Sequence, residues 1–209
     1  RTIGKTADAK DPTTIVTANI GDALTLDPAA CYDTASGEVL QNIYETLVFY
    51  DGEKTDEFVP QLAEEYSVSE DGTEWTFKIR EGLKWSDGQP MTSDDYVFWW
   101  NDVLSNKEIT PTFPSTFKAG GEPGTLTKVD DYTFKMVFKA AYPVLAIYLA
   151  QPRLINPKHY CQKFHAAYVD KATLDKMVAD AKFERWDQLF GAKCNSTNAI
   201  LDNPELPTW

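Results

Sequence analysis

The sequence predicts a mixed α/β (α+β) fold, and three patterns support this prediction. Residues 64–68 and 74–80 each alternate polar and apolar side chains around the turn residues SEDGT, which is typical of a β-hairpin. Residues 132–138 alternate in the same way, with Tyr132, Phe134, Met136 and Phe138 on one face. Residues 160–190 instead repeat apolar side chains every three or four positions, which indicates amphipathic helices. Strands and helices are mixed without an internal repeat, so we expect a β-rich segment inserted into a larger α/β unit.

The elements before the hairpin are an expected strand at residues 13–21, a loop at 22–36 and a helix within 37–50. The helix is predicted because Val39, Ile43 and Leu47 recur every four residues, which places them on one face.

A second helix is predicted to begin after Thr92, because this N-cap residue is followed three positions later by Asp95. Its apolar stripe contains both Trp99 and Trp100, which we therefore expect in the core. The acidic residues Asp94, Asp95 and Asp102 fall on the opposite face, and Phe98 alone departs from the pattern. Residues 111–125, rich in Pro and Gly, are expected to form a long surface loop.

The composition excludes some classes of function. The chain has 20 basic and 32 acidic residues, a net charge of −12, and its basic residues do not cluster. Phosphate backbones would repel such a protein, so we expect no nucleic-acid partner. A hydrophobic content of 43% can build a core, and no run reaches the roughly 18 apolar residues of a membrane helix.

Residues 1–14 are small, polar and charged, and we interpret them as a flexible leader. The three cysteines lack the spacing of a zinc site. Cys161 and Cys194 could pair in an oxidising compartment, which would leave Cys31 free, or all three could stay reduced.

No catalytic or metal-binding pattern is evident. His159 and His165 are six residues apart and would not share a helical face, so neither a metal nor a cofactor is expected. The motifs of serine hydrolases, zinc proteases and P-loop proteins are absent from the sequence. Acidic residues are so numerous that any carboxylate pair is uninformative, and a secreted hydrolase stays open as a rival interpretation.

Several segments together resemble a known family. LDPA, NIYETLVFYDG, the long block FVPQLAEEYSVSEDGTEWTFKIREGLKWSDGQPMTSDDYVFWWNDVL, VDDYTFKMVFKAAYP and INPKHY occur in the order found in family 5 extracellular solute-binding proteins. These proteins are the oligopeptide and dipeptide receptors of bacterial ABC importers. The resemblance extends from about residue 26 to residue 160.

The resemblance implies a lobe of the type II periplasmic-binding-protein kind with an inserted β-rich subdomain. Residues 15–45 and 141–209 would belong to lobe one and residues 46–140 to the subdomain. Members of the family are much longer, so the chain is expected to be an N-terminal portion from which the second lobe is absent.

The same resemblance suggests candidate ligand-binding residues but no catalytic ones. The segment around the start of the first helix would face the cleft between the lobes, where helix N-terminal amides suit a carbonyl or carboxylate. The candidates are Tyr32, Asp33, Thr34, Ser36, Gln151 and Arg153. The alternative is that Asp33, Thr34 and Ser36 only cap the helix, that Tyr32 only packs and that Arg153 is a solvated charge.

The expected function is therefore capture of a small-molecule ligand, by closure of two lobes, for delivery to an ABC permease in the membrane. Oligopeptides are the first expectation, and cello- or xylo-oligosaccharides are the second, because Tyr and Trp can stack on sugar rings. Such a protein would be a monomer outside the cytoplasm, in the periplasm or at the cell surface, where a lipid anchor is an option.

Overall fold

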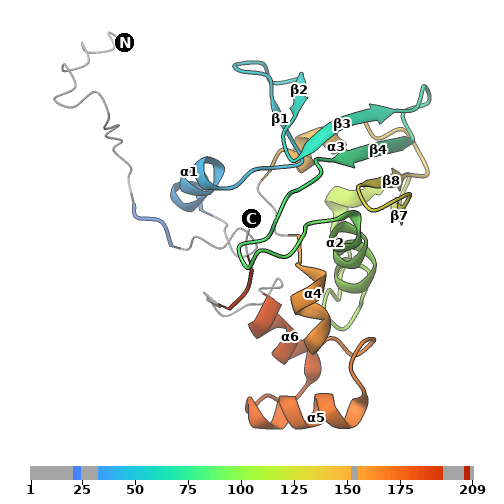
Figure 1. Ribbon diagram of the computed structural model, residues 1–209. Helices are drawn as coiled ribbons and strands as arrows, with labels where there is room; N and C mark the ends of the chain where they lie inside the picture. The colour runs from blue at the N-terminus through green and yellow to red at the C-terminus, as the bar shows by residue number, and fades with distance from the viewer. Residues whose placement is uncertain (1–20, 25–32, 152–154, 195–204, 208–209) are drawn as a thin grey trace, which may run out of the picture.

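The computed structural model describes residues 21–24, 33–151, 155–194 and 205–207. Its centre is a four-stranded antiparallel sheet in the order β3-β4-β8-β7, with β3 at Ala63–Val68, β4 at Glu74–Ile79, β7 at Thr125–Lys128 and β8 at Thr133–Val137. Figure 1 shows this sheet above a group of helices that contains α4 (Lys158–Cys161), α5 (Lys171–Asp180) and α6 (Trp186–Cys194). The mixed fold class predicted from the sequence is confirmed.

The sheet forms because its alternating residues give it one apolar face. In β4, Trp75, Phe77 and Ile79 are buried, while the residues between them are partly exposed. Phe77 lies opposite Phe134 of β8, and their ring centroids are 5.5 Å apart. Cross-strand aromatic pairs of this kind fix the register, because a shift of one residue would move every apolar side chain to the wrong face. The predicted hairpin and the predicted strand at 132–138 are both confirmed.

The helix after Thr92 covers the apolar face of the sheet. It consists of α2 (Ser93–Phe98) and a π-helical continuation, η1 (Trp99–Leu104). Both parts of the predicted capping box are present. The Thr92 side chain accepts a backbone N–H of the first turn, and Asp95 Oδ2 accepts the Thr92 N–H at 2.9 Å. Trp99 and Trp100 are buried against the sheet side, as expected. The wider π turn brings consecutive bulky residues onto a broad buried surface.

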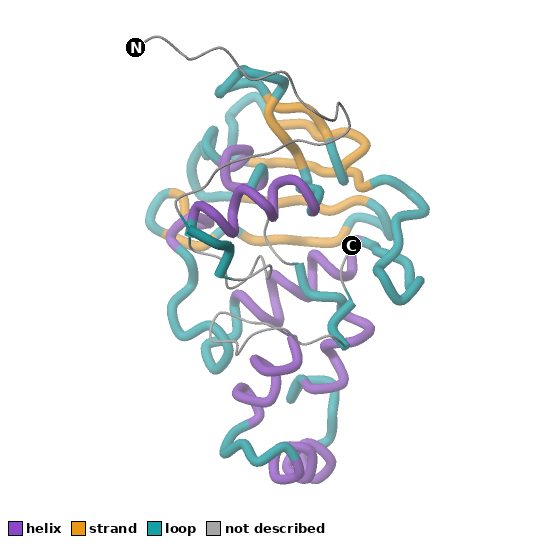
Figure 2. Tube along the Cα trace, turned by 90° about the vertical axis from the view of Figure 1, so that its left-hand side faces the viewer, coloured by secondary structure: helices purple, strands orange, loops and turns teal. Residues whose placement is uncertain are grey.

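The face of this helix opposite the sheet is partly buried, although the sequence placed acidic residues on it. Phe98 and Val103 are buried in a second apolar cluster that also contains Phe190 of α6. Asp95 is likewise only 3% exposed. The reason is that the helices α4 and α6 cover this side, so α2 and η1 lie between two layers (Figure 2).

A disulfide joins the first and last helices of the second layer. Cys161 at the end of α4 is bonded to Cys194 at the end of α6, with a Cα–Cα distance of 5.8 Å. Both residues are fully buried in the cluster around Phe98, and η3 (Gln162–Phe164) and α5 lie between them in sequence. The pairing that the sequence left open is therefore present.

The helix predicted within residues 37–50 is shorter than expected and begins earlier. It is α1, Thr34–Ile43, and it is followed by β1 (Val48–Tyr50), which pairs with β2 (Phe58–Pro60). The chain becomes extended at Tyr44, and Thr46 then donates its N–H to the Gln61 side chain at 2.6 Å. As a result, Val39 and Ile43 stay 38% and 54% exposed instead of sharing a buried face with Leu47. The apolar periodicity was misleading because Leu47 lies just before β1, where it is buried together with Val48 of that strand.

The predicted long loop at 111–125 contains regular structure. A 3₁₀ turn, η2 (Ser115–Phe117), leads into the short pair β5 (Lys118–Ala119) and β6 (Glu122–Pro123). Phe117 is only 1% exposed because its ring packs against Trp99 and Trp100, so the segment is partly core.

Helix α3 (Leu145–Leu149) follows β8. The leader expected at 1–14 and all but the last residue of the strand expected at 13–21 lie outside the described residues. The boundaries of the lobe and subdomain stay a prediction.

Loss of the disulfide is expected to destabilise the chain. The bond closes a loop across a sequence separation of 33, which corresponds to about 3–4 kcal/mol of unfolding free energy in the chain-entropy account. We therefore expect Cys161→Ser to lower the urea midpoint strongly, and reductant to have no further effect on that variant. Cys31→Ser, which leaves the bond intact, is the matched control. Equal urea midpoints for the two variants would contradict the prediction.

Candidate functional site

The N-terminal turn of α1 was the first candidate ligand site. Asp33 is its N-cap and accepts the Ser36 N–H at 2.8 Å, and the bonds from Ser36 hold the pKa of this carboxyl below its ordinary value. Ser36 is fully buried, and its Oγ accepts the Leu24 N–H at 2.9 Å. Thr34 is exposed. Asp33 and Ser36 thus stabilise the local structure, whereas Tyr32 lies outside the described residues.

Gln151, the second candidate, lies at the other end of α1. It lines a small cavity of about 40 Å³ together with Glu45 and Thr46, which follow that helix. Ten helical residues span roughly 15 Å, so the structure does not bring Gln151 next to the α1 N-terminus. Ligand pockets usually measure about 300–1,000 Å³, so this cavity cannot hold a peptide or an oligosaccharide. Arg153 lies outside the described residues.

The conspicuous block around residues 83–95 is structural. The turn closes with the Gly88 N–H donating to the Trp85 carbonyl at 2.8 Å, and Gly88 has a φ of 84°, which suits glycine. Trp85 is 2% exposed, and its Nε1–H donates to Asp95 Oδ2 at 3.3 Å. The other carboxylate oxygen, Oδ1, accepts the Lys158 N–H of α4 at 2.8 Å. One buried carboxylate therefore connects the turn, α2 and α4.

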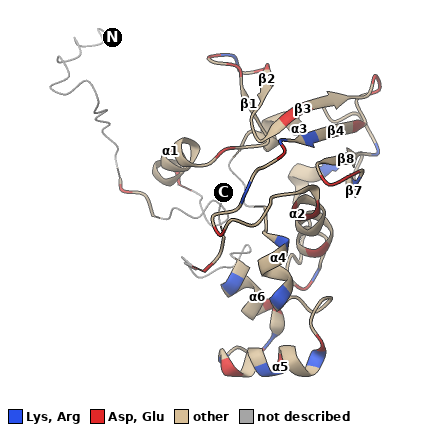
Figure 3. Ribbon diagram, viewed as in Figure 1, with Lys and Arg blue, Asp and Glu red and all other residues tan. Residues whose placement is uncertain are grey.

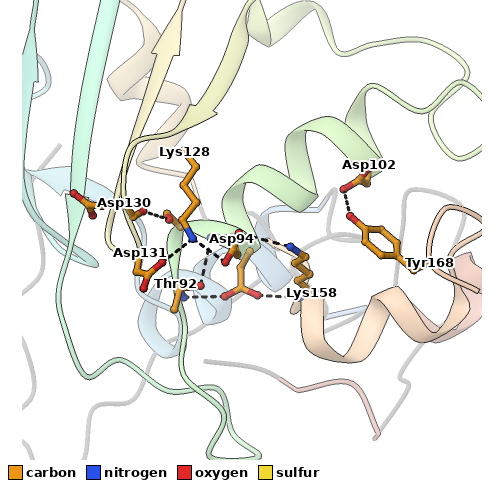
Figure 4. Close-up of polar contacts among 10 residues, drawn as sticks. Thr92, Asp94, Asp102, Lys128, Asp130, Asp131, Lys158 and Tyr168 are labelled. Atoms are coloured by element: carbon orange, nitrogen blue, oxygen red, sulfur yellow. Dashed lines mark hydrogen bonds and ion pairs between the residues drawn. The ribbon is translucent and has the colours of Figure 1, made fainter.

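Around this buried group lies an outer set of charges (Figure 4). Lys128 Nζ binds Asp94 at 3.0 Å and Asp131 at 2.7 Å, and Lys158 Nζ lies 3.6 Å from Asp94. Burial works against ionisation of Asp94, but the bond from Lys128 and the charge of Lys158 hold its pKa below the ordinary value. The side chains in these ion pairs are between 31% and 75% exposed. Each pair therefore contributes at most about 1 kcal/mol to the free energy of unfolding. Acidic and basic residues are interspersed along the described elements, as Figure 3 shows.

A larger groove lies elsewhere, between α5, the start of α6 and the loop after η1. Its volume is about 870 Å³, which is within the range of ligand pockets. None of the candidate residues from the sequence lines it. Four of its charged residues form two ion pairs, Lys171 with Asp175 and Arg185 with Asp187.

His165, which the sequence gave no reason to treat as a metal ligand, is a buried titratable residue. It is 2% exposed and is surrounded by the rings of Phe98, Tyr168, Trp186 and Phe190. Its Nδ1 accepts the Ala167 N–H at 3.1 Å, so Nε2 carries the proton that reaches the Asp102 carbonyl at 3.0 Å. Burial lowers the pKa of His165, although the Asp102 carbonyl and the charges of Asp102 and Glu108 oppose this. The ring is thus held neutral by its surroundings.

No group of three His, Cys, Asp or Glu side chains suited to a metal ion occurs in the part of the chain that the structure describes. Among the same residues, none of the helices has the length and hydrophobicity needed to span a bilayer.

Comparison with known proteins identifies the class. Residues 57–188 match the family model described as bacterial extracellular solute-binding proteins, family 5 Middle. A solved structure of oligopeptide-binding protein OppA superposes with a TM-score of 0.71 at 32% identity, covering 86% of this chain and 27% of that one.

Two curated relatives show the range within this class. The oligopeptide-binding protein OppA of Bacillus subtilis is 28% identical over 185 residues, covering 86% of this chain and 31% of the relative. The periplasmic alpha-galactoside-binding protein of Rhizobium meliloti is 41% identical over 85 residues, covering 41% of this chain and 12% of the relative.

The fold and these similarities define a lobe of a type II periplasmic binding protein. The chain belongs to the bacterial extracellular solute-binding proteins of family 5. It spans about a third or less of the length of these relatives, so it represents only a portion of such a protein.

The neutral, buried state of His165 predicts a pH dependence. Because its folded pKa is depressed, its contribution to stability is complete above the unfolded value near 6.5 and is lost as the pH falls below it. We expect His165→Gln to be less stable than the unchanged chain at pH 7.5 and the gap to narrow toward pH 5, in denaturant unfolding.

Phe190→Leu is the control, since it loosens the same cluster without removing a titrating group. Its stability gap to the unchanged chain should not vary with pH. A gap for His165→Gln that is constant between pH 7.5 and pH 5 would show that the histidine is not held neutral.

Proposed function

We propose that the chain forms part of the substrate-binding component of a bacterial ABC importer that captures oligopeptides. The observation that carries the proposal is the superposition on oligopeptide-binding protein OppA, which covers most of this chain. In this proposal the ligand is held between two lobes of the whole protein, and closure of the lobes presents it to a membrane permease. The protein works as a monomer outside the cytoplasm, in the periplasm or on a lipid anchor at the cell surface.

The described structure supports a role for this chain as one rigid wall of the proposed ligand pocket. The sheet, α2 and the second helical layer share buried cores, and the conspicuous polar residues at 85–95 bind other parts of the scaffold. Neither the capped N-terminus of α1 nor the cavity at Gln151 provides a pocket of ligand size. The proposal therefore assigns most ligand contacts to the second lobe, with residues 32–36, Gln151 and Arg153 contributing from this one.

A second candidate ligand is an oligosaccharide. The relative with 41% identity over 85 residues is an alpha-galactoside-binding protein, which favours α-galactosides over the cello- and xylo-oligosaccharides suggested by aromatic content alone. A hydrolytic function receives no support from the names of the relatives.

The test is calorimetric titration of the whole protein that contains this chain, in parallel with the 209-residue chain. The thermal stabilisation of each protein by each ligand is measured as well. A mixed peptide pool, an α-galactoside series and a cello-oligosaccharide series serve as ligands. We expect the peptides to raise the melting temperature of the whole protein in a saturable way, because a ligand bound only by the folded state stabilises it. The 209-residue chain should keep its fold but bind at least about tenfold more weakly, because one wall of the pocket is missing.

Stabilisation by α-galactosides alone would replace peptides with the second candidate. Tight peptide binding by the 209-residue chain would contradict the two-lobe pocket, and turnover of any of these ligands would contradict a binding function.

A further inference from the structure

The small cavity beside Gln151 has an unusual lining. It is about 40 Å³ and lies between α2, the strand β8 and the segments that follow α1 and α3. Most of its wall is apolar, formed by side chains such as Leu47, Trp99, Phe134, Met136 and Ile155. Its polar lining residues are Glu45, Thr46, Tyr96, Tyr148 and Gln151.

The hydroxyl of Tyr96 lacks a hydrogen-bond partner. Tyr96 is 4% exposed, and its OH group is buried with no donor or acceptor in reach among the described residues. An unpaired buried hydroxyl is costly, so such groups normally bind protein or ordered water. The ring itself is fixed, because it stacks on Phe134 with centroids 4.6 Å apart.

The side-chain amide of Gln151 is likewise not engaged by the described residues. Only its backbone N–H is bonded, to the Tyr148 carbonyl at 3.4 Å. Thr46, another polar residue of the wall, differs because its Oγ1 already donates to the Val48 carbonyl and contacts Gln61. Among the polar residues of the wall, Tyr96 therefore presents a buried hydroxyl without a partner, and Gln151 presents an amide that the described residues leave unbonded.

We propose that this cavity is an internal hydration site, in which water bridges the Tyr96 hydroxyl and the Gln151 amide. A single water needs roughly 10–15 Å³ of such space, so about 40 Å³ suffices for one to three molecules. Hydroxyl and amide groups can each both donate and accept, which matches the bonding of water. An entirely apolar cavity of this size would stay dry.

The position of the bridge gives it a structural role. Tyr96 belongs to the predicted subdomain, whereas Gln151 follows α3 in the part assigned to lobe one. Water thus replaces a direct side-chain contact at the junction of the two parts. A water-mediated bond is nearly as favourable as a direct one, and its geometry can adjust when the parts shift.

Substitution of Tyr96 by phenylalanine decides between a wet and a dry cavity. Tyr96→Phe removes only the hydroxyl and keeps the stacked ring, so the chain is expected to fold. If water pairs with the hydroxyl, the melting temperature should fall by about 2–4 °C. If the hydroxyl is unpaired, its removal should raise the melting temperature, and the proposal would be overturned.

A double-mutant cycle tests the bridge itself. Gln151→Met removes the amide at similar length, and in the Tyr96→Phe background it should have a much smaller effect than alone, because both changes break one bridge. Tyr142→Phe is the control, since that hydroxyl bonds the Thr116 carbonyl at 2.7 Å and does not line the cavity. Its combination with Gln151→Met should be additive. Additivity for the Tyr96 pair as well would refute a shared bridge.

A direct observation completes the test. In NMR spectra of the 209-residue chain, the Tyr96 ring protons should show a cross-relaxation signal to long-lived water, and Gln151→Met should weaken it. Absence of that signal in the unchanged chain would overturn the proposal independently of stability.

Discussion

The structure depends on one buried carboxylate. Asp95 is 3% exposed and accepts three N–H groups, from the Thr92 and Lys158 backbones and from the Trp85 indole. Burial raises the pKa of Asp95, although these donors oppose the shift. A carboxylate can be buried at acceptable cost only if several donors are held in place around it. The three segments that supply the donors are therefore fixed together, and the turn, α2 and α4 form one unit.

This unit places a single helix between two apolar layers. The sheet side of α2 and η1 carries Tyr96, Trp99 and Trp100, and the other side carries Phe98 and Val103. A helix that is apolar on both faces couples the two cores, so the sheet and the disulfide-linked helices are not independent. In the function proposed above, this coupling would provide a stiff wall against which a second lobe closes. The residues that carry the family resemblance thus maintain the scaffold, and the described candidate residues Asp33, Thr34, Ser36 and Gln151 belong to neither apolar cluster.

Much of the fold could be predicted from the sequence, because local rules suffice for it. Strict alternation identified β4 and β8, and the spacing of Thr92 and Asp95 located the start of α2. The errors arose where tertiary contacts decide. The burial of Phe98 and Asp95 could not be predicted because nothing local reveals that α4 and α6 cover them. Helix α1 ends early because Thr46 pairs with Gln61, fifteen residues later. The roles of Asp33, Ser36 and Gln151 as ligand residues stay a prediction, and His165 and the unpaired hydroxyl of Tyr96 became evident only from burial.

The most direct test of this account is the unfolding free energy of Asp95→Ala beside that of Asp94→Ala in urea. Asp95→Ala leaves three buried donors without an acceptor, and we expect a loss of about 2–4 kcal/mol. Asp94→Ala removes only partly exposed ion pairs and should cost less than about 1 kcal/mol. A large loss confined to Asp95→Ala would establish the buried carboxylate as the connection between the layers. Similar small losses for both variants would contradict it.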